Sequence, residues 1–284
     1  MSNTIAPPVY VAPPGVEPQR FGLLSVAQTV DEASQRWELG LEWEPLACTR
    51  AGVASIVCDT FDEYDAPGYP LDPREDGGLV EASPFLVVGS YTCKAASRDL
   101  EEAEQRARQH LAAGEERAVE YAIASGAGGN APSFQGATDL TPTAGTAVEL
   151  ADGFGLLEAH LAENHHSVGT IHAPRLLAPA IGQGQFAWRQ GQRLETLVGT
   201  FVAAGGGYDL ANLGPAGSAP SAGTAWLFAT GRPQLRRGQV FVNDGQSAFD
   251  KGSNDVTFFA QRSYAVAWDC VTAAVLVEAP GGNG

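Results

Sequence analysis

The sequence predicts an α+β fold, in which two helices pack against strands of mostly antiparallel character. Two stretches, 97–124 and 142–163, carry apolar residues at the three- and four-residue spacing of a helix face, and several short apolar runs have the length of strands. Strands and helices do not alternate regularly and no repeat of fixed period occurs, which argues against a doubly wound sheet and a solenoid. With 44% hydrophobic and 18% charged residues, the 284-residue chain can bury a substantial core.

The charge balance is strongly acidic, because 33 Asp and Glu residues outnumber 17 Lys and Arg residues, which gives a net charge of −16. Such a surface repels phosphate groups, so we exclude a protein that wraps nucleic acid over its general surface. Lys94 and Lys251 are the only lysines, which leaves two candidates for any chemistry that needs a lysine amine. Residues 1–20 lack the apolar segment of a signal peptide, and no run is long enough to span a bilayer, so we expect no membrane partner.

The four cysteines, Cys48, Cys58, Cys93 and Cys270, form no CxxC pair and lack the spacing of a zinc ribbon. For a chain without a secretion signal we expect reduced, buried thiols. A disulfide between Cys48 and Cys58 is the alternative.

The N-terminal region lacks a helical pattern. Residues 1–22 contain five prolines and are expected to form an extended arm, either a disordered tail, which the sequence favours, or a strap on a neighbouring subunit. Residues 37–43 alternate apolar and acidic side chains, which predicts a strand whose apolar face holds Trp37 and Trp43. Proline, glycine and acidic residues in 61–83 predict a long loop.

The strongest helical pattern covers 97–124. Ser97 can cap its N-terminus, acidic residues occupy its first turn, and the glycine-rich stretch 125–129 ends it. Its apolar stripe consists of Leu100, Ala103, Ala107, Leu111, Ala118, Ala122 and Ile123. At ~1.5 Å per residue this helix would be roughly 40 Å long. A second helix is expected over 142–163, with a Thr-Pro pair at its start.

Strands dominate the rest of the chain. The predicted elements are a strand at 84–93, a strand at 168–174 that leads into a short helix at 174–182, a hairpin at 186–197, and strands at 199–204, 224–231 and 239–243. The apolar stretch 256–278 is long enough for two strands that meet near Asp269 and Cys270. Residues 205–223 are rich in glycine, proline and serine and are expected to form a loop.

Three consecutive glycines, Gly205, Gly206 and Gly207, follow a strand-like run and raise the question of a phosphate-binding loop. Such loops carry a lysine and a Ser or Thr after the glycines and open a helix. Here Tyr208 and Asp209 follow, no lysine is near, and a carboxylate would repel a phosphate. We therefore interpret the glycines as permissive backbone for a tight turn, and we predict no cofactor site.

Four histidines, His160, His165, His166 and His172, lie within thirteen residues and are the best metal candidates. They lack the HExxH spacing and a third ligand at a known distance, so we favour a solvent-facing helix end and predict no metal site. A metal-dependent enzyme that uses these histidines with Glu158 is the lesser alternative. The sequence contains no GxSxG motif and no other catalytic pattern, so we predict no catalytic residue and no enzyme.

Four stretches carry a family resemblance through their order and spacing: 106–129, with a Glu-Glu pair before a glycine-rich exit; 169–181, where a strand enters a helix after a proline; 191–209; and 255–278. Together they resemble the major capsid protein of tailed bacteriophages, a fold shared with encapsulin shells. Phe201 departs from the family pattern, which commonly has a proline there. The C-terminal strand and the tryptophan-rich segment 36–45 are similar to structural proteins of phages that infect actinobacteria.

The resemblance implies a division of the chain into parts of a shell subunit. These are an N-terminal arm (1–29), an extended β-hairpin loop with a lead-in strand (30–92), a peripheral domain (93–165 and 251–284) with the spine helix 97–124, and an axial α/β domain (166–250). The extended loop would lie across a neighbouring subunit, and the axial domain would converge on five- and six-fold axes. The three glycines would then form a bend in the axial domain.

The resemblance also implies a structural function without catalysis. The chain would assemble through pentamers and hexamers into the icosahedral head shell of a virion, around double-stranded DNA that it contacts only indirectly. Scaffolding, portal or decoration proteins would be further partners. The candidate subunit-interface residues are Trp37, Trp43, Arg106, Glu115, Glu116 and Arg262. The alternative for the two tryptophans is the core of their own chain.

An encapsulin-like nanocompartment shell, which would enclose protein instead of DNA, is the alternative function. The proline-rich arm favours a phage, because encapsulins generally begin with a short helix at this point.

Overall fold

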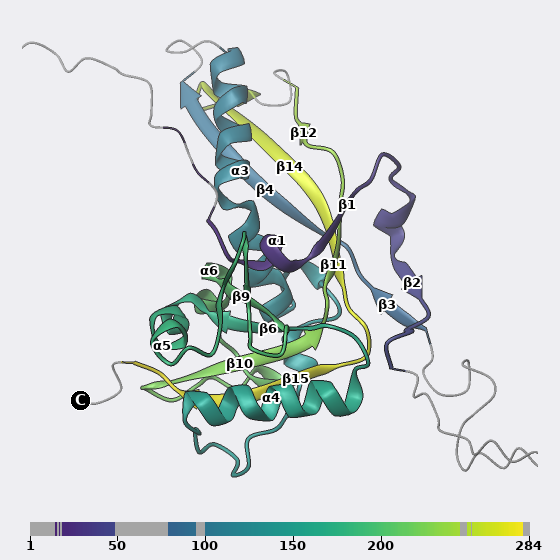
Figure 1. The fold of residues 1–284 in the computed structure, drawn as a ribbon. Helices are drawn as coiled ribbons and strands as arrows, with labels where there is room; N and C mark the ends of the chain where they lie inside the picture. Colours follow the sequence, from purple (N-terminus) through teal and green to yellow (C-terminus); the bar gives the residue numbers. More distant parts are fainter. Residues whose placement is uncertain are drawn as a thin grey trace, which may run out of the picture.

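The computed structural model describes residues 15, 17, 19–48, 79–94, 100–244, 249–250 and 252–280. Most of the expected arm, the acidic loop over 61–78, Cys58 and Ser97 lie outside these residues. In the described part of the chain the elements group around two large sheets, which lie one above the other in the view of Figure 1.

The first sheet is built on one long antiparallel ladder between β4 and β14. Its described strands are β1 (Gln28–Asp31), β4 (Phe85–Lys94), β11 (Gln234–Arg237), β12 (Phe241–Val242), β13 (Phe249–Asp250) and β14 (Asp255–Ala267). The β4–β14 ladder runs from the pair Phe85–Tyr264 to the pair Lys94–Asp255. Alternate residues of the first half of β4 are buried, because helix α3 (Leu100–Ser125) packs along this ladder (Figure 1).

Helix α3 confirms the predicted long helix. Most of the expected stripe is buried, and its buried members are Ala103, Ala107, Leu111, Ala122 and Ile123. Leu100 is exposed and Ala118 is half-buried. The alanines have short side chains, so the helix axis can lie close to the ladder. The helix ends at Ser125, the first residue of the stretch 125–129 that was expected to stop it.

The second sheet is mixed. Its described strands, in spatial order, are β5 (Thr138–Asp139), β15 (Thr272–Glu278), β10 (Thr224–Gly231), β6 (Gly169–Pro174), β9 (Phe201–Gly205), β8 (Arg193–Glu195) and β7 (Trp188–Gln190). β10 pairs antiparallel with both β15 and β6, whereas β6 and β9 are parallel. Every residue of β6 and β9 is buried, so the centre of this sheet is covered on both faces.

Two cores flank the second sheet. On one face, α4 (Leu150–Asn164) and α5 (Ala178–Gln183) cover a cluster that includes Leu157, Ile171 and Leu227. On the other face, Phe134 stacks on Phe228 at 4.5 Å between ring centroids and belongs to the cluster that also contains the α3 stripe. The sheet therefore separates the lower helices from α3 and the first sheet, as Figure 1 shows.

The smaller described elements lie around these sheets. They are α1 (Leu23–Val26), β2 (Leu41–Trp43), β3 (Val80–Ala82) and α6 (Gly206–Leu210), with 3-10 segments at Arg36–Leu39, Ala127–Gly129, Phe134–Gly136, Arg175–Leu177 and Pro215–Gly217. β2 and β3 pair as a separate antiparallel ribbon at the side of the molecule (Figure 1). α1 lies beside the N-terminal end of the described chain, next to β9 and α3.

The second helix begins later than predicted, at Leu150 and not at 142. The preceding residues instead pair along the same edge of β15 as β5. Leu140 N donates to Ala274 O at 2.8 Å, and Val148 forms an isolated parallel bridge with Val277. An exposed sheet edge offers backbone hydrogen bonds to a passing segment, and here those bonds outweigh the helical pattern of the sequence.

The predicted strand over 37–43 is wrong in its first half. Residues Arg36–Leu39 form a 3-10 segment, and only Leu41–Trp43 is a strand. Gly40, between them, has a φ of +125°, which breaks the extended backbone on which the alternating pattern depends.

The predicted helix 174–182, the hairpin 186–197 and the strand pair within 256–278 are confirmed. β11 was not predicted, because its sequence Gln-Leu-Arg-Arg is too polar to read as a strand. It is nevertheless held between β1 and β14 in the first sheet.

Candidate functional site

The junction between α3, α1 and α6 is the most constrained polar site in the described part of the chain. Glu120 of α3 is 1% exposed. Its Oε1 accepts a hydrogen bond from Leu23 N at 2.9 Å, and its Oε2 accepts one from Gly207 N at 2.8 Å. One turn earlier, Glu116 Oε1 accepts a hydrogen bond from Leu24 N at 3.1 Å. Two carboxylates of one helix thus bind the first N–H groups of two short helices, which have no partner within their own helix.

The electrostatics of this junction follow from its burial. Burial raises the pKa of Glu120 to about 7, although the two backbone N–H groups and Arg175 oppose the shift. Burial also raises the pKa of Glu116 above its usual value. The carboxylates hold three segments together, and Glu116 also lines a cleft between segment 19–25 and Arg189.

The junction also explains the three glycines. None of them has a left-handed φ, so the expected reason, permissive backbone for a turn, is wrong. A side chain on Gly207 would place its Cβ 2.7 Å from Tyr121 N of α3, and one on Gly205 would lie 2.5 Å from Glu120 Oε1. Glycine is required because the α6 backbone approaches α3 closely.

The chain after the glycines is also not simply loop, because α6 begins at Gly206. The Gly207 N–H in its first turn donates to the carboxylate of Glu120, so an anionic group of the same chain already binds this helix N-terminus. Glu120 itself was not among the predicted residues. The signal in the sequence was an acid inside the apolar run Ala118–Ala124.

A second polar cluster ties α3 to β14. Arg262 Nη1 lies 3.2 Å from Glu115 Oε2, and Tyr264 Oη donates to the same oxygen at 2.7 Å. The side chains of Glu115 and Arg262 are 16% and 20% exposed. Burial, together with the neighbouring Glu115, raises the pKa of Tyr264 well above its usual value.

The remaining interface candidates also contact their own chain. Arg106 pairs with Glu102 at 2.8 Å and lies over the ring of Tyr91. Trp37 is 6% exposed, whereas Trp43 is half-buried and donates from its Nε1 to Asp269 Oδ1 at 2.8 Å. The structure therefore brings Glu115 and Arg262 together, and the role of all six residues between subunits stays a prediction.

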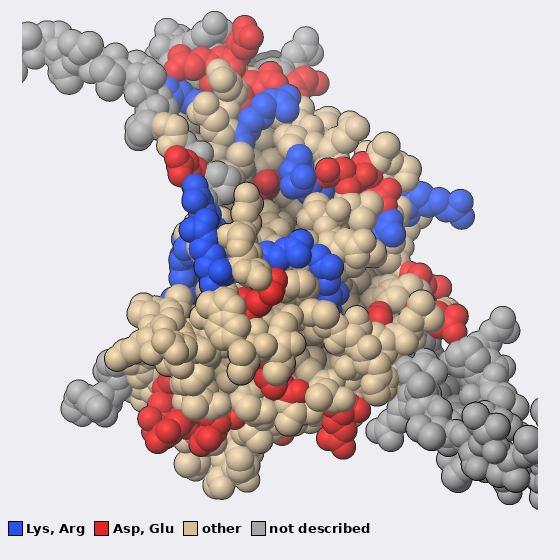
Figure 2. Space-filling model, in the orientation of Figure 1, with Lys and Arg blue, Asp and Glu red and all other residues tan. Residues whose placement is uncertain are grey.

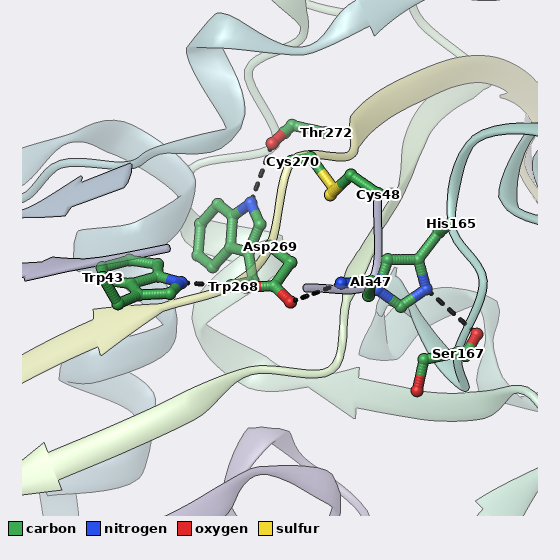
Figure 3. The surroundings of a disulfide bond; sticks show 9 residues. All are labelled: Trp43, Ala47, Cys48, His165, Ser167, Trp268, Asp269, Cys270 and Thr272. Carbon is green, nitrogen blue, oxygen red and sulfur yellow. Dashed lines mark hydrogen bonds between the residues drawn. A yellow bond between two sulfur atoms is a disulfide. The ribbon is translucent and has the colours of Figure 1, made fainter. Parts of the chain in front are cut away.

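A disulfide joins Cys48 to Cys270, which corrects the expectation of reduced cysteines (Figure 3). The bond closes a corner after β14, where Asp269 accepts hydrogen bonds from Trp43 Nε1 and, at 3.4 Å, from Ala47 N. The partners are 222 residues apart in sequence, so no spacing rule could pair them. Cys93 is a free thiol, and Cys58 lies outside the described residues.

The histidines are separated and not gathered. His172 is fully buried in β6, with Nδ1 2.9 Å from Tyr208 Oη and Nε2 2.9 Å from Thr230 Oγ1, and burial lowers its pKa to about 3. His165 is buried beside the disulfide corner, with Nδ1 3.0 Å from Ser167 O (Figure 3). The expected position at a solvent-facing helix end is therefore wrong for these two residues. His172 lies in the central strand β6, and His165 is buried beside the disulfide.

In the described part of the chain, no three His, Cys, Asp or Glu side chains are grouped so that they could hold a metal ion. Within the same residues, no helix is both long and apolar enough to cross a membrane.

Comparison with known proteins gives structural matches alone. No family model matches the sequence, and no curated protein matches it. The capsid of an empty GTA particle matches with a TM-score of 0.58 at 16% identity, over 96% of this chain and 95% of that chain. The capsid of Ralstonia phage GP4 matches with a TM-score of 0.57 at 10% identity, over 99% of this chain and 97% of that chain.

A structure of Microbacterium phage Oxtober96 matches with a TM-score of 0.56 at 13% identity, over 96% of both chains. The likeness extends over nearly the whole length of each chain, so it concerns the complete arrangement of elements. The chain has the fold of tailed-phage capsid subunits, as the sequence resemblance predicted.

Proposed function

We propose that this chain is the major capsid protein of a tailed phage, which self-assembles into the icosahedral head shell around the genome. The observation that carries the proposal is the end-to-end match to capsid chains, which covers at least 95% of both partners in the three comparisons above. An enzyme with a capsid-like core and added catalytic parts would leave part of its chain unmatched. The role is structural, and the protein is located in the virion capsid.

The division into shell parts belongs to the same proposal. The arm 1–29 and the extended loop within 30–92 are the segments that reach neighbouring subunits, and α3 is the spine of the peripheral domain. β15 pairs with β10 in the second sheet, and α4 packs on both strands. The proposed division assigns α4 and β15 to the peripheral part (93–165 and 251–284) and β10 to the axial part (166–250), so this sheet would join the two parts.

Within one subunit, the polar clusters supply rigidity. The carboxylates of Glu116 and Glu120 fix α1 and α6 on α3, Glu115 fixes β14, and the disulfide closes the corner after β14. A shell needs subunits whose faces keep a constant geometry over many copies, since small angular errors accumulate around a closed surface.

The proposed partners are other copies of the chain, arranged in pentamers and hexamers, together with scaffolding, portal or decoration proteins. Packaged double-stranded DNA is a neighbour in the lumen. The net charge of −16 per copy favours a lumen that does not adsorb DNA.

Gel filtration and negative-stain microscopy of the protein, expressed alone and isolated from its native source, test the proposal. We expect closed shells, and shells from the native source should contain DNA that resists added nuclease. Shells filled with protein would assign the chain to the encapsulin-like alternative. A stable 29.6 kDa monomer in both preparations would contradict both kinds of shell.

A further inference from the structure

Five arginines lie within or around the short segment 19–26 on one face of the molecule. They come from separate places in the sequence: Arg20, Arg175, Arg189, Arg193 and Arg232. Figure 2 shows Lys and Arg side chains gathered across the middle of this face, in the region of α1 in Figure 1. We call these five residues the arginine patch.

Contacts to segment 19–26 link the members of the patch. Arg193 Nε donates to Ser25 O and Arg232 Nε donates to Val26 O, each at 3.1 Å. Both guanidinium groups also lie over the ring of Phe201, at 5.2 and 5.0 Å from its centroid.

The other three arginines lie around the start of the same segment. Arg175 Nη1 donates to Arg20 O at 3.3 Å, and Arg189 lies over the ring of Phe21 at 5.6 Å. Arg20 and Arg189 line one cleft of about 430 Å³.

In the described part of the chain, no carboxylate forms a salt bridge with the patch. Among the described residues, none of its five members has an Asp or Glu oxygen within 4.0 Å, whereas arginines elsewhere, such as Arg106, Arg237 and Arg262, are paired. Glu116, which lines the same cleft, and Glu120 interact electrostatically with Arg175, whose charge opposes the rise that burial causes in their pKa values. Burial and the neighbouring Arg193 lower the pKa of Arg232, as expected for like charges that lack a counterion.

The small number of close counter-charges contrasts with the excess of acids in this chain. The sequence holds 33 acidic and 17 basic residues, yet among the described residues no acid forms a salt bridge with a member of the patch. Clustered cations with a desolvated member are stabilised by carboxylates at salt-bridge distance, which the described residues of the same chain do not supply.

We infer that the arginine patch docks the carboxylates of a second copy of this chain. The inference rests on the proposed shell function, in which every copy meets others through different faces, so that one face can receive its complement from the next copy. Charge complementarity favours this occupant, because each copy carries sixteen more acids than bases.

The described helix α4 shows that such an acidic surface exists. This helix contains no Lys or Arg. Its exposed acids are Glu149, which precedes the first helical residue, and Asp152 and Glu163 within the helix. Acidic side chains lie over this lower region in Figure 2. Double-stranded DNA is disfavoured as the occupant, since the rest of the surface would repel it.

Arg189→Lys provides a direct test, because the chain has only two other lysines. Arg189 is exposed, and its guanidinium donates only to Gly191 O among the hydrogen bonds described. A carbodiimide joins an amine to a carboxylate that is in direct contact with it, and the water lost in forming the amide is taken up by the reagent. Treated particles of this variant should give covalent dimers and larger multimers on a denaturing gel, at least tenfold above wild type.

Mixed particles of ¹⁴N- and ¹⁵N-labelled subunits identify links between copies by mass spectrometry, because a peptide pair then carries both labels. Arg108→Lys is the matched control, since Arg108 lies 2.8 Å from Glu104 of its own helix. It should give an intrachain link to that residue and no increase in multimers.

Assembled particles that give no multimers, or a lysine that couples only within its own chain, would overturn the inference and leave the shell function intact. Absence of particles by microscopy would contradict the shell function, and the inference would fall with it. A DNA of 50 base pairs tests the other occupant. If it binds to unassembled subunits and Arg189→Glu abolishes the binding, the patch is a DNA-binding site, which also overturns the inference.

Discussion

Glu120 is the residue on which most of the described junction depends. A carboxylate inside an apolar helix face is costly to bury, yet here it accepts hydrogen bonds from the backbone of two other elements. Removing the acceptor would leave two buried N–H groups without a partner, so the position tolerates few substitutions.

The raised pKa of Glu120 predicts a pH dependence of folding stability. The unfolded chain releases this proton near pH 4.5, whereas the folded chain keeps it until about pH 7. The group therefore contributes stability that is fully present below pH 4.5 and is lost as the pH rises through 7, a change on the order of 3 kcal/mol. Urea unfolding of the unassembled subunit at pH 5 and pH 8 measures this difference.

Glu120→Gln should flatten that dependence, because glutamine does not titrate. The variant should also be less stable than wild type at pH 5 by about 1–3 kcal/mol, because its NH₂ group would face one of the two backbone donors. Glu163→Gln, at the exposed end of α4, is the control and should keep the wild-type pH profile. An unchanged profile in Glu120→Gln would show that Glu120 does not titrate in this range.

Two glycines on or near α3 make opposite predictions. Gly207→Ala should destabilise the subunit by about 1–3 kcal/mol. The added Cβ would lie 2.7 Å from Tyr121 N, and this backbone atom of α3 cannot move aside without distorting the helix. Gly114→Ala should stabilise it by about 0.5–1 kcal/mol, because it lies in the helix interior with no heavy atom within 4 Å of the new Cβ. Thermal unfolding of the two variants compares them directly, and shifts of the same sign would contradict the close approach of α6.

At the scale of elements, α3 and the β14–β15 pair were predictable because their patterns are long and their partners are local or adjacent. The start of α4 was not, since residues before Leu150 pair with the edge of β15, a contact that depends on tertiary structure. β11 was missed for the same reason: its polar sequence becomes a strand only because β1 and β14 lie on either side of it.

The corner after β14 is the element-scale feature that sequence reasoning missed. It joins the strand pair β14–β15 to the segment after β2 through the disulfide and through Asp269. Since the two cysteines are separated by 222 residues, the pairing restricts the unfolded chain over most of its length.

Cys270→Ser should therefore lower the free energy of unfolding by about 2–5 kcal/mol under oxidising conditions. Cys93→Ser, which removes the free thiol, is the control and should have a much smaller effect. Thiol titration of the denatured wild-type protein, before and after reduction, should show two cysteines that react only after reduction. If all four thiols react without reduction, the bond is absent from the protein.

At the scale of the whole molecule, the order of elements carried the prediction of the fold. Each of these elements is common by itself. Their order along the chain, with the long helix first, then the α/β segment and then the late strand pair, matches the capsid fold. The junction at Glu120 and the arginine patch could not be predicted, because each gathers residues from segments far apart in the chain.

The two sheets give the subunit two unlike parts. The upper part is a long ladder backed by one helix, and the lower part is a mixed sheet covered by helices (Figure 1). Segment 19–26 runs between them and carries both the carboxylate contacts of α3 and the backbone contacts of the arginine patch. A neighbour that binds the patch would therefore act on the same segment that joins the two parts.

Electron cryo-microscopy of the purified assembly tests the central claim most directly. The account predicts a closed icosahedral shell, with density for this fold at every subunit position and contacts between copies at the arginine patch. A discrete ring or dimer with no closed surface, or a homogeneous population of single 29.6 kDa chains, would contradict it.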